Sequence, residues 1–202
     1  MPRKAKEPLE LKEACVQAAR EVIAERGVEN LSLRDVARKL GVSHQAPYKH
    51  YPSRDHLLAE VMRRCFEGFA AHLDAREHVD DPAADLASLG QRYLSYAAAH
   101  PLEYRLMFGT PWPAPADHPD VARCAVHAFD ILRVVLRRMH GTAASKRKAV
   151  DLDALFIWST MHGLASISQA NVMEQLELSP KVRGEAVAHV MAMVRKAMAD
   201  SR

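Results

Sequence analysis

Most residues from 43 to 50, SHQAPYKH, have hydrogen-bonding side chains, and only Ala46 and Pro47 are plainly apolar. Imidazole, amide, phenol and ammonium groups can pair with base edges and phosphate oxygens, which is the chemistry of nucleic-acid recognition. A helix of this composition, predicted over residues 44 to 51, has little apolar surface to bury. We interpret it as a helix held by its neighbours and suited to the major groove of DNA.

The preceding residues predict the element that positions this helix. Ser32 can cap a helix at residues 33–40, with Asp35 reaching back to it, and the apolar residues of that helix share one face. Gly41 then ends the helix, because glycine tolerates the left-handed conformation of a tight turn. Ser43 is expected to cap the polar helix that follows. The pattern predicts two short helices joined by a glycine turn.

Two residues of the polar helix need separate interpretation. Tyr51 is expected to pack its ring in the domain core, since a large aromatic fits better between helices than in a groove. Pro47 forfeits a backbone bond if it lies inside the helix, but costs nothing if His44 is the cap and Pro47 falls in the first turn. The alternative for any single polar residue here is an ordinary solvated helix face.

The ordered motif resembles the helix-turn-helix of the TetR family of transcriptional regulators. Gly41, Val42 and Ser43 match its GVS turn, Tyr48 its central tyrosine and Arg54 its basic residue at the start of the next helix. The resemblance implies base-edge or groove roles for some residues and phosphate contacts for others. The DNA-binding residues expected from the motif are Arg34, Ser43, His44, Gln45, Ala46, Tyr48, Lys49, His50 and Arg54, with Tyr48, His50, Arg34 and Arg54 against the backbone.

Charge and composition are consistent with this interpretation and exclude others. Residues 1–54 hold 11 Lys and Arg against 7 Asp and Glu, a net of +4, which leaves −1 for the rest of a chain of net charge +3. No apolar stretch is long enough to span a membrane, so we expect a cytoplasmic protein without membrane contact. The three cysteines stand in apolar helical patterns and are expected to be reduced core thiols. We identify no catalytic residues, metal site or cofactor, and predict that the chain is not an enzyme.

Every convincing hydrophobic period in the chain is helical. Stripes at residues 11–23, 58–69, 86–97 and 121–139, with a short helix opening at Pro101, predict an all-α protein of about nine helices. We expect a three-helix N-terminal DNA-binding domain over residues 1–54, with its motif at about 32–51. Residues 55–202 are expected to form a helical effector-binding and dimerisation domain. The proline-rich stretch 109–119 is expected to be a rigid loop, in which Trp112 either pins the loop to the core or covers a pocket.

The last two helices carry more apolar surface than one chain needs. Residues 151–173 are apolar nearly all round, and the helix that starts at Pro180 has two apolar stripes. One face can meet the core, whereas the other requires a second subunit, so we predict a homodimer through these helices. The alternative is a fully buried central helix. In a two-fold dimer, the two DNA-binding domains would also match successive major grooves, which are about 34 Å apart.

Trp158, His162 and Gly163 resemble the signature of the Trp-His-Gly type of TetR C-terminal domain. The family resemblance implies a repressor that binds a palindromic operator on double-stranded DNA as a dimer and leaves it when a small molecule binds. Candidates for a pocket that takes an apolar effector of modest size are Tyr104, Met107, Phe108, Trp112, Cys124, His127, Phe129, Phe156, Trp158, Met161 and His162. For His162, a core histidine bonded to a neighbour is the competing interpretation. Alternatives for the whole chain are a protein-interaction module, or an activator without a small-molecule inducer.

Overall fold

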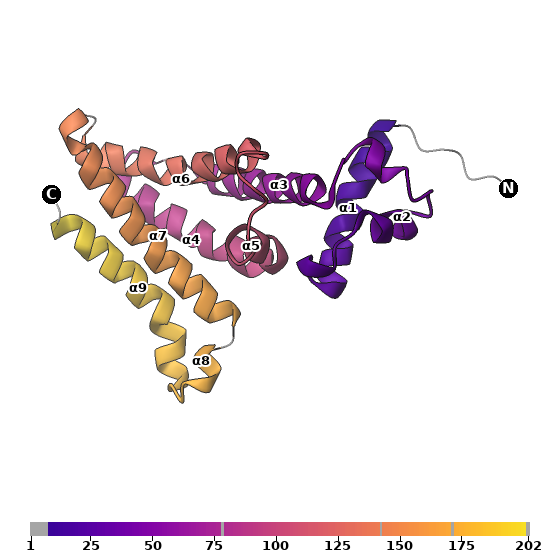
Figure 1. The fold of residues 1–202 in the computed structure, drawn as a ribbon. Helices are drawn as coiled ribbons and strands as arrows, with labels where there is room; N and C mark the ends of the chain where they lie inside the picture. The colour runs from indigo at the N-terminus through magenta and orange to yellow at the C-terminus, as the bar shows by residue number, and fades with distance from the viewer. Residues whose placement is uncertain (1–7, 78, 142, 171, 201–202) are drawn as a thin grey trace. The chain divides into compact units, whose positions relative to one another are not determined.

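The computed structural model describes residues 8–77, 79–141, 143–170 and 172–200, and all regular elements in these ranges are helices (Figure 1). This confirms the predicted all-α class. The elements run in the order α1 Pro8–Arg26, η1 Val28–Asn30, α2 Leu33–Leu40, η2 Pro47–Lys49, α3 Arg54–Asp74, α4 Pro82–Ala99, α5 Pro101–Phe108, α6 Pro119–His140, η3 Ala144–Lys146, α7 Arg147–Gln169, α8 Val172–Gln175 and α9 Pro180–Asp200.

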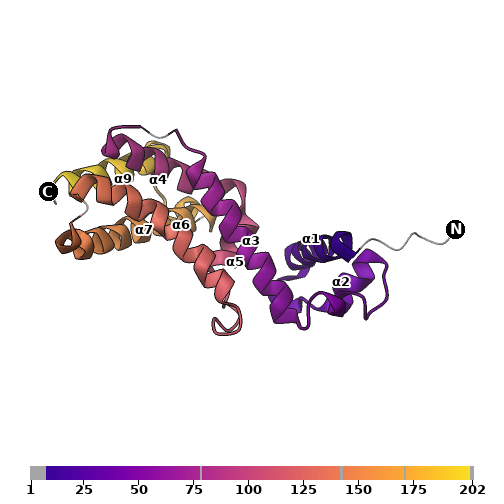
Figure 2. The same cartoon turned by 90° about the horizontal axis from the view of Figure 1, so that it is seen from above.

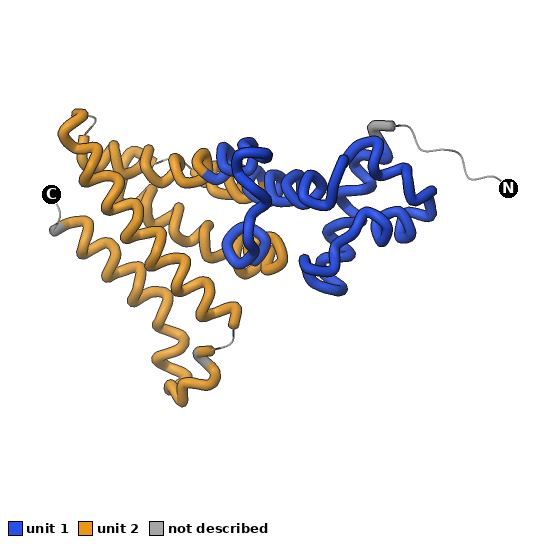
Figure 3. The backbone as a smooth tube through the Cα atoms, in the orientation of Figure 1, with its two compact units in different colours: residues 1–67, 105–125 blue, residues 68–104, 126–202 orange. Residues whose placement is uncertain are grey.

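Two compact units divide the chain, and they do not follow the sequence order (Figure 3). Unit 1 combines residues 1–67 with residues 105–125, and unit 2 combines residues 68–104 with residues 126–202. The second half of α5, the proline-rich loop and the first turns of α6 therefore group with the N-terminal helices. The predicted domains, 1–54 and 55–202, treat the chain as two consecutive blocks and stay a prediction.

Unit 1 is built on a small apolar core that three helices share. Ile23 of α1, Val36 of α2 and Leu57 of α3 are essentially inaccessible to solvent. Helices α1 and α2 lie side by side in both ribbon views (Figures 1 and 2). The stripe predicted for the first helix is the buried one, because residues three and four apart fall on one helix face. The helix ends before Gly27, which has a φ of 85°.

Unit 2 packs α4, α7 and α9 against one another, and α8 joins the antiparallel pair α7 and α9 (Figure 1). The predicted stripe of α4, at Leu86, Leu89, Tyr93 and Ala97, is buried. Helix α9 begins at Pro180 after Ser179, whose hydroxyl accepts a bond from the Val182 amide at 3.3 Å. Among the described side chains of α9, only Val194 and Met198 are buried.

A buried ionic cluster in unit 2 links α4 to Arg76, Val79 and Asp80. Asp85 is fully buried and accepts bonds from Arg76 Nε at 2.6 Å and Arg138 Nη1 at 2.5 Å. Arg138 also donates to the carbonyls of Val79 and Asp80, at 2.7 and 3.0 Å. A buried carboxylate is tolerated only when its charge is paired and its oxygens are bonded. Asp85 therefore joins α4, the end of α6 and the residues after α3.

Replacing Asp85 with alanine should destabilise the protein strongly, because the Arg76 guanidinium would stay buried without its counter-charge. We expect a loss of about 3–5 kcal/mol in the free energy of unfolding, measured by urea denaturation. The control is Asp130→Ala, which breaks a partly exposed pair with Arg133 and should cost under about 1 kcal/mol. Equal losses in the two variants would contradict the role assigned to the cluster.

Candidate DNA-binding site

Helix α2 has the predicted caps at both ends. The Asp35 amide donates to the Ser32 hydroxyl at 3.1 Å, and that hydroxyl donates to the Asp35 carboxylate. This bond, with the charges of Arg38 and Arg26, holds the pKa of Asp35 below its ordinary value. Gly41 ends the helix in the left-handed region with a φ of 66°, and its amide bonds the Arg38 carbonyl at 3.2 Å. The cap and the glycine turn are confirmed.

The reading segment, residues 43–51, differs from the predicted helix. It is a turn followed by the 3-10 helix η2, so the expected α-helix over residues 44–51 is wrong. The bonds from the Ala46 amide to the Ser43 carbonyl, at 3.0 Å, and from the Lys49 amide to the Ala46 carbonyl, at 3.3 Å, both span three residues. Pro47 has no amide hydrogen to bond the Ser43 carbonyl, and its ring crowds that carbonyl in an α-helix. The tighter 3-10 turn avoids both costs.

Two residues of the reading segment are buried in the core of unit 1. Pro47 is fully buried, and Tyr51 is 4% exposed, as predicted for its ring. The Tyr51 hydroxyl donates to the Lys12 carbonyl of α1 at 3.4 Å, and burial raises the pKa of the Tyr51 phenol. A segment this short has too few backbone bonds to be stable alone. Contacts with α1 and α2 therefore fix its conformation.

The polar side chains of the reading segment point to solvent. Ser43, His44, Gln45, Tyr48 and Lys49 are exposed, and Tyr48 is 43% exposed although it carries an aromatic ring. Ala46 and His50 are half-buried. An exposed tyrosine beside amide, imidazole and ammonium groups presents donors and acceptors suited to base edges and phosphates. The structure thus gathers the predicted residues of this segment on one continuous stretch.

The two arginines predicted to flank the reading segment differ in their bonding. Arg34 is exposed on α2. Arg54 donates from Nη2 to the Val28 carbonyl at 2.7 Å and from Nε to the Leu31 carbonyl at 3.2 Å, and pairs with Asp55 at 3.0 Å. These bonds tie the start of α3 to the turn before α2. Arg54 therefore anchors the motif, and its predicted contact with phosphate stays a prediction.

The residues proposed for an effector pocket are divided between the two units. Met107, Phe108, Trp112 and Cys124 belong to unit 1. The members in unit 2 are Tyr104, His127, Phe129, Phe156, Trp158, Met161 and His162. In unit 2, His127 and Phe156 are exposed, whereas Tyr104 and Met161 are buried. The pocket as a whole stays a prediction.

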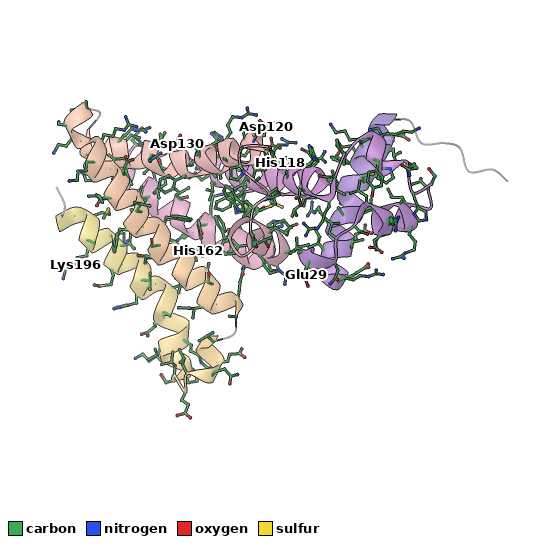
Figure 4. The ribbon with its side chains drawn as sticks, in the orientation of Figure 1. Glu29, His118, Asp120, Asp130, His162 and Lys196 are labelled. Carbon is green, nitrogen blue, oxygen red and sulfur yellow. The ribbon has the colours of Figure 1, made fainter. Side chains whose placement is uncertain are left out.

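A buried polar network lies in unit 2 around His162, which is labelled in Figure 4. His162 Nδ1 lies 2.7 Å from the Tyr104 hydroxyl and 3.4 Å from the Tyr93 hydroxyl, and the two hydroxyls are 2.9 Å apart. Burial lowers the pKa of His162 and raises the pKa of both tyrosines. Trp158 is inclined to the His162 ring at 6.1 Å, as their spacing on one helix face predicts. Tyr93 was not predicted, because a tyrosine in an apolar stripe resembles ordinary core.

Trp112 packs against the helices of unit 1. Its indole nitrogen donates to the Met107 carbonyl at 2.9 Å, and its ring meets Phe66 of α3 edge-on at 5.3 Å. Phe108 meets the same Phe66 ring at 5.8 Å. Of the two roles considered for Trp112, these contacts favour the one in which it pins the loop. The Cys124 thiol lies 4.0 Å from a Glu67 carboxylate oxygen, and burial raises the pKa of this thiol.

Some classes of site find no support in the described ranges. No cluster of His, Cys, Asp and Glu side chains there has the geometry to hold a metal ion. No helix in the same ranges is long and apolar enough to cross a membrane. The reading segment exposes Ser43, His44, Gln45, Tyr48 and Lys49. An all-helical chain with a capped helix, a glycine turn and an exposed polar segment is a helix-turn-helix protein of the DNA-binding class.

Comparison with known proteins identifies the family. Residues 16–61 match the family of bacterial regulatory proteins of the tetR type, and residues 86–194 match the tetracyclin repressor-like C-terminal domain. The chain belongs to the TetR family of transcriptional regulators. Members of this family regulate transcription and are not enzymes, which agrees with the prediction. The Trp-His-Gly subtype stays a prediction.

Individual proteins resemble this chain in sequence or in fold. The HTH-type transcriptional regulator Rv1816 of Mycobacterium tuberculosis is 31% identical over 134 residues, which cover 63% of this chain and 56% of that protein. A protein of unknown function from Rhodococcus sp. RHA1 is 25% identical with a TM-score of 0.71, over 98% of this chain and 96% of its own. A second Rhodococcus protein, a transcriptional regulator, is 23% identical with a TM-score of 0.66, over 92% and 96% of the two chains, and shows the shared fold.

Because Arg54 and Arg34 differ in their hydrogen bonds, their removal should have different effects on the stability of the protein. Arg54→Ala should lower the free energy of unfolding by about 1.5–3 kcal/mol, since two carbonyls lose a charged donor. Arg34→Ala should leave stability within about 0.5 kcal/mol, as is usual for an exposed residue. Thermal and urea unfolding of both variants check this. Unchanged stability in Arg54→Ala would contradict the anchoring role.

Proposed function

We propose that the protein is a transcriptional repressor that binds a palindromic operator as a homodimer and is released by a small apolar ligand. It would act in the cytoplasm on double-stranded DNA, through the reading segment. The observation that carries the DNA-binding part is the exposure of His44, Gln45, Tyr48 and Lys49 on a segment that buries Pro47 and Tyr51. Such a division leaves the polar groups of the segment available to a partner.

The dimer part is supported by apolar surface on α7 and α9. Large apolar side chains stay exposed along both helices within one chain: Leu152, Leu155, Phe156, Ile167, Val182, Val187 and Met193. Large apolar side chains left exposed on two neighbouring helices are typical of an interface. A second copy of the same two helices would cover them in a four-helix arrangement.

Two glycines support the same interface. Gly163 of α7 and Gly184 of α9 are helical, and a Cβ added to either would meet no atom within 4 Å in the described part of the chain. A helical glycine costs about 1 kcal/mol relative to alanine. Gly90, by contrast, is explained within the chain, because Met191 lies 2.8 Å from its added Cβ. Close approach of a second chain would explain Gly163 and Gly184.

The release part is supported by the polar network of Tyr93, Tyr104 and His162. Trp158 and Phe129, which meet at 5.8 Å, give aromatic surface in the same unit. An apolar ligand with one hydrogen-bonding group would suit such surroundings. The two alternatives are an activator without an inducer and a helical protein-interaction module. The exposed reading segment favours the DNA-binding functions over the last.

Substitutions in the reading segment should weaken DNA binding without unfolding the protein. Tyr48→Ala and Lys49→Ala are expected to raise the dissociation constant about 10-fold each, which corresponds to about 1.4 kcal/mol. The probe is the DNA upstream of the protein's own gene, in salt-dependent gel shifts. Melting temperature and dimerisation should match those of the wild type. If both variants keep wild-type affinity, the reading segment is not the DNA-binding element.

A large residue at Gly163 should separate the dimer and spare the monomer. Gly163→Leu adds a side chain where the chain itself leaves space, so helix content should be kept while the dimer dissociation constant rises at least about 10-fold. Analytical ultracentrifugation measures this. Ala98→Leu, on an exposed position of α4, is the matched control. A wild-type protein that is monomeric at all concentrations, or a Gly163→Leu variant that dimerises normally, would overturn the proposed interface.

A further inference from the structure

A polar cavity of about 230 Å³ lies within unit 1, apart from the exposed face of the reading segment. Helices α1 and α3, the end of the reading segment, the loop before α6 and the first turn of α6 supply its walls. Its lining residues are Lys12, His50, Tyr51, His56, Ala59, Glu60, Arg63, Asp117, His118, Pro119, Asp120 and Val121. Three histidines therefore face one cavity, and imidazole is the side chain whose charge changes between about pH 5 and 8.

Two of these histidines are in direct contact. The rings of His56, in the first turn of α3, and His118, directly before α6, meet edge to face with their centroids 4.8 Å apart. His118 and Asp120 are labelled in Figure 4. The contact joins the 109–118 loop to α3, close to the anchor formed by Arg54. A neutral pair can stack in this way, whereas two imidazolium ions at this separation repel each other.

Charged groups of both signs surround the two rings. With neutral imidazoles the cavity wall has two cations, Lys12 and Arg63, and three carboxylates, Glu60, Asp117 and Asp120, for a net charge of −1. Four further charged groups form ion pairs with these lining residues or with one another: Arg64, Arg123, Glu13 and Glu67. Their two positive and two negative charges cancel. A first proton brings the net charge to zero. Protonation of both His56 and His118 makes it +1, and His50 would make it +2.

His56 is also part of the N-terminal cap of α3. Its amide donates to the Ser53 hydroxyl at 3.3 Å, and its Nδ1 lies 2.8 Å from the same hydroxyl. With neutral His56, the hydroxyl can donate to Nδ1 while its oxygen accepts from the amide, in the manner of a capping box. Protonated Nδ1 can only donate, so the hydroxyl must turn. The charge of His56 thus affects both its contact with His118 and the start of α3.

We propose that the His56–His118 contact is a proton-sensitive link between the 109–118 loop and α3. Near neutral pH the link is closed and holds the loop on the first turn of α3. At acidic pH the second proton separates the rings and releases the residues around His118. The consequence for DNA affinity rests on the proposed function, whereas the opening of the link does not.

Amide hydrogen exchange tests the link in the full-length protein without DNA. The Asp117 and His118 amides bond the Ala114 carbonyl at 3.0 and 3.1 Å, and the Val121 amide bonds the His118 carbonyl at 3.2 Å. These amides report whether the turn is closed. Between about pH 7.5 and 5.5, after correction for the intrinsic pH dependence of exchange, we expect their protection to fall about fivefold or more.

Variants separate this link from general acid effects. His118→Gln keeps a polar side chain that cannot become cationic, so protection should not depend on pH, while His100→Gln, on an exposed histidine of unit 2, should behave as wild type. Wild-type protection that does not fall, or an equal fall in His118→Gln, overturns the proposal. If the amides of His118→Gln are unprotected already at neutral pH, the same measurement is made on His56→Gln. Amide protection that no longer depends on pH in His56→Gln supports the link, and protection that still falls with pH overturns it.

DNA binding supplies a second readout, with the DNA upstream of the protein's own gene as the probe. Other effects of acidification on DNA binding are common to the wild type and His118→Gln. The link opens in the wild type only, so wild-type affinity should fall at least about threefold relative to His118→Gln at acidic pH. Equal pH dependence in the two overturns the effect on binding. If neither protein binds DNA at either pH, the proposed function fails while the exchange result stands.

Discussion

The missing amide hydrogen of Pro47 is the constraint on which the DNA-binding motif depends. It removes the α-helical bond to the Ser43 carbonyl, and residues 43–50 take three-residue bonds and a 3-10 turn instead. The segment is stable because Pro47 and Tyr51 are buried and the Tyr51 hydroxyl bonds the Lys12 carbonyl. Since these groups occupy the inner side, His44, Gln45, Tyr48 and Lys49 are left exposed. The same constraint thus shapes the backbone and selects the exposed groups.

Local signals in the sequence predicted the local features of the structure. Ser32, Gly41 and the apolar stripes depend on neighbouring residues alone, and each is where the pattern places it. The effect of Pro47 depends on which residue opens the helix, and the sequence pattern leaves that open. The Asp85 cluster could not be predicted, because Arg138 meets this carboxylate from 53 residues away along the chain. Charges separated along the chain carry no periodic signal.

The grouping of residues 105–125 with the N-terminal helices divides the predicted effector residues between the two units. Composition alone selected aromatic and sulfur-containing residues, yet Met107, Phe108 and Trp112 serve contacts within unit 1, where Phe66 meets two of their rings. In unit 2, hydrogen bonding identifies a smaller group, Tyr93, Tyr104 and His162, that composition did not separate from ordinary core. Buried polar groups in mutual contact are more informative about a site than apolar residues, because their burial must be compensated.

Under the proposed function, the short reading segment explains why the protein would bind DNA as a dimer. A 3-10 turn offers fewer side chains to a groove than an α-helix of several turns, and Ala46 supplies no hydroxyl. Each good bidentate base contact discriminates by about 1–3 kcal/mol. Gln45 is suited to such a contact, so one chain can distinguish few base pairs. The net charge of +4 on residues 1–54 adds affinity without specificity. Two readers would double the base contacts, and the exposed faces of α7 and α9, with Gly163 and Gly184, offer the surface that would pair them.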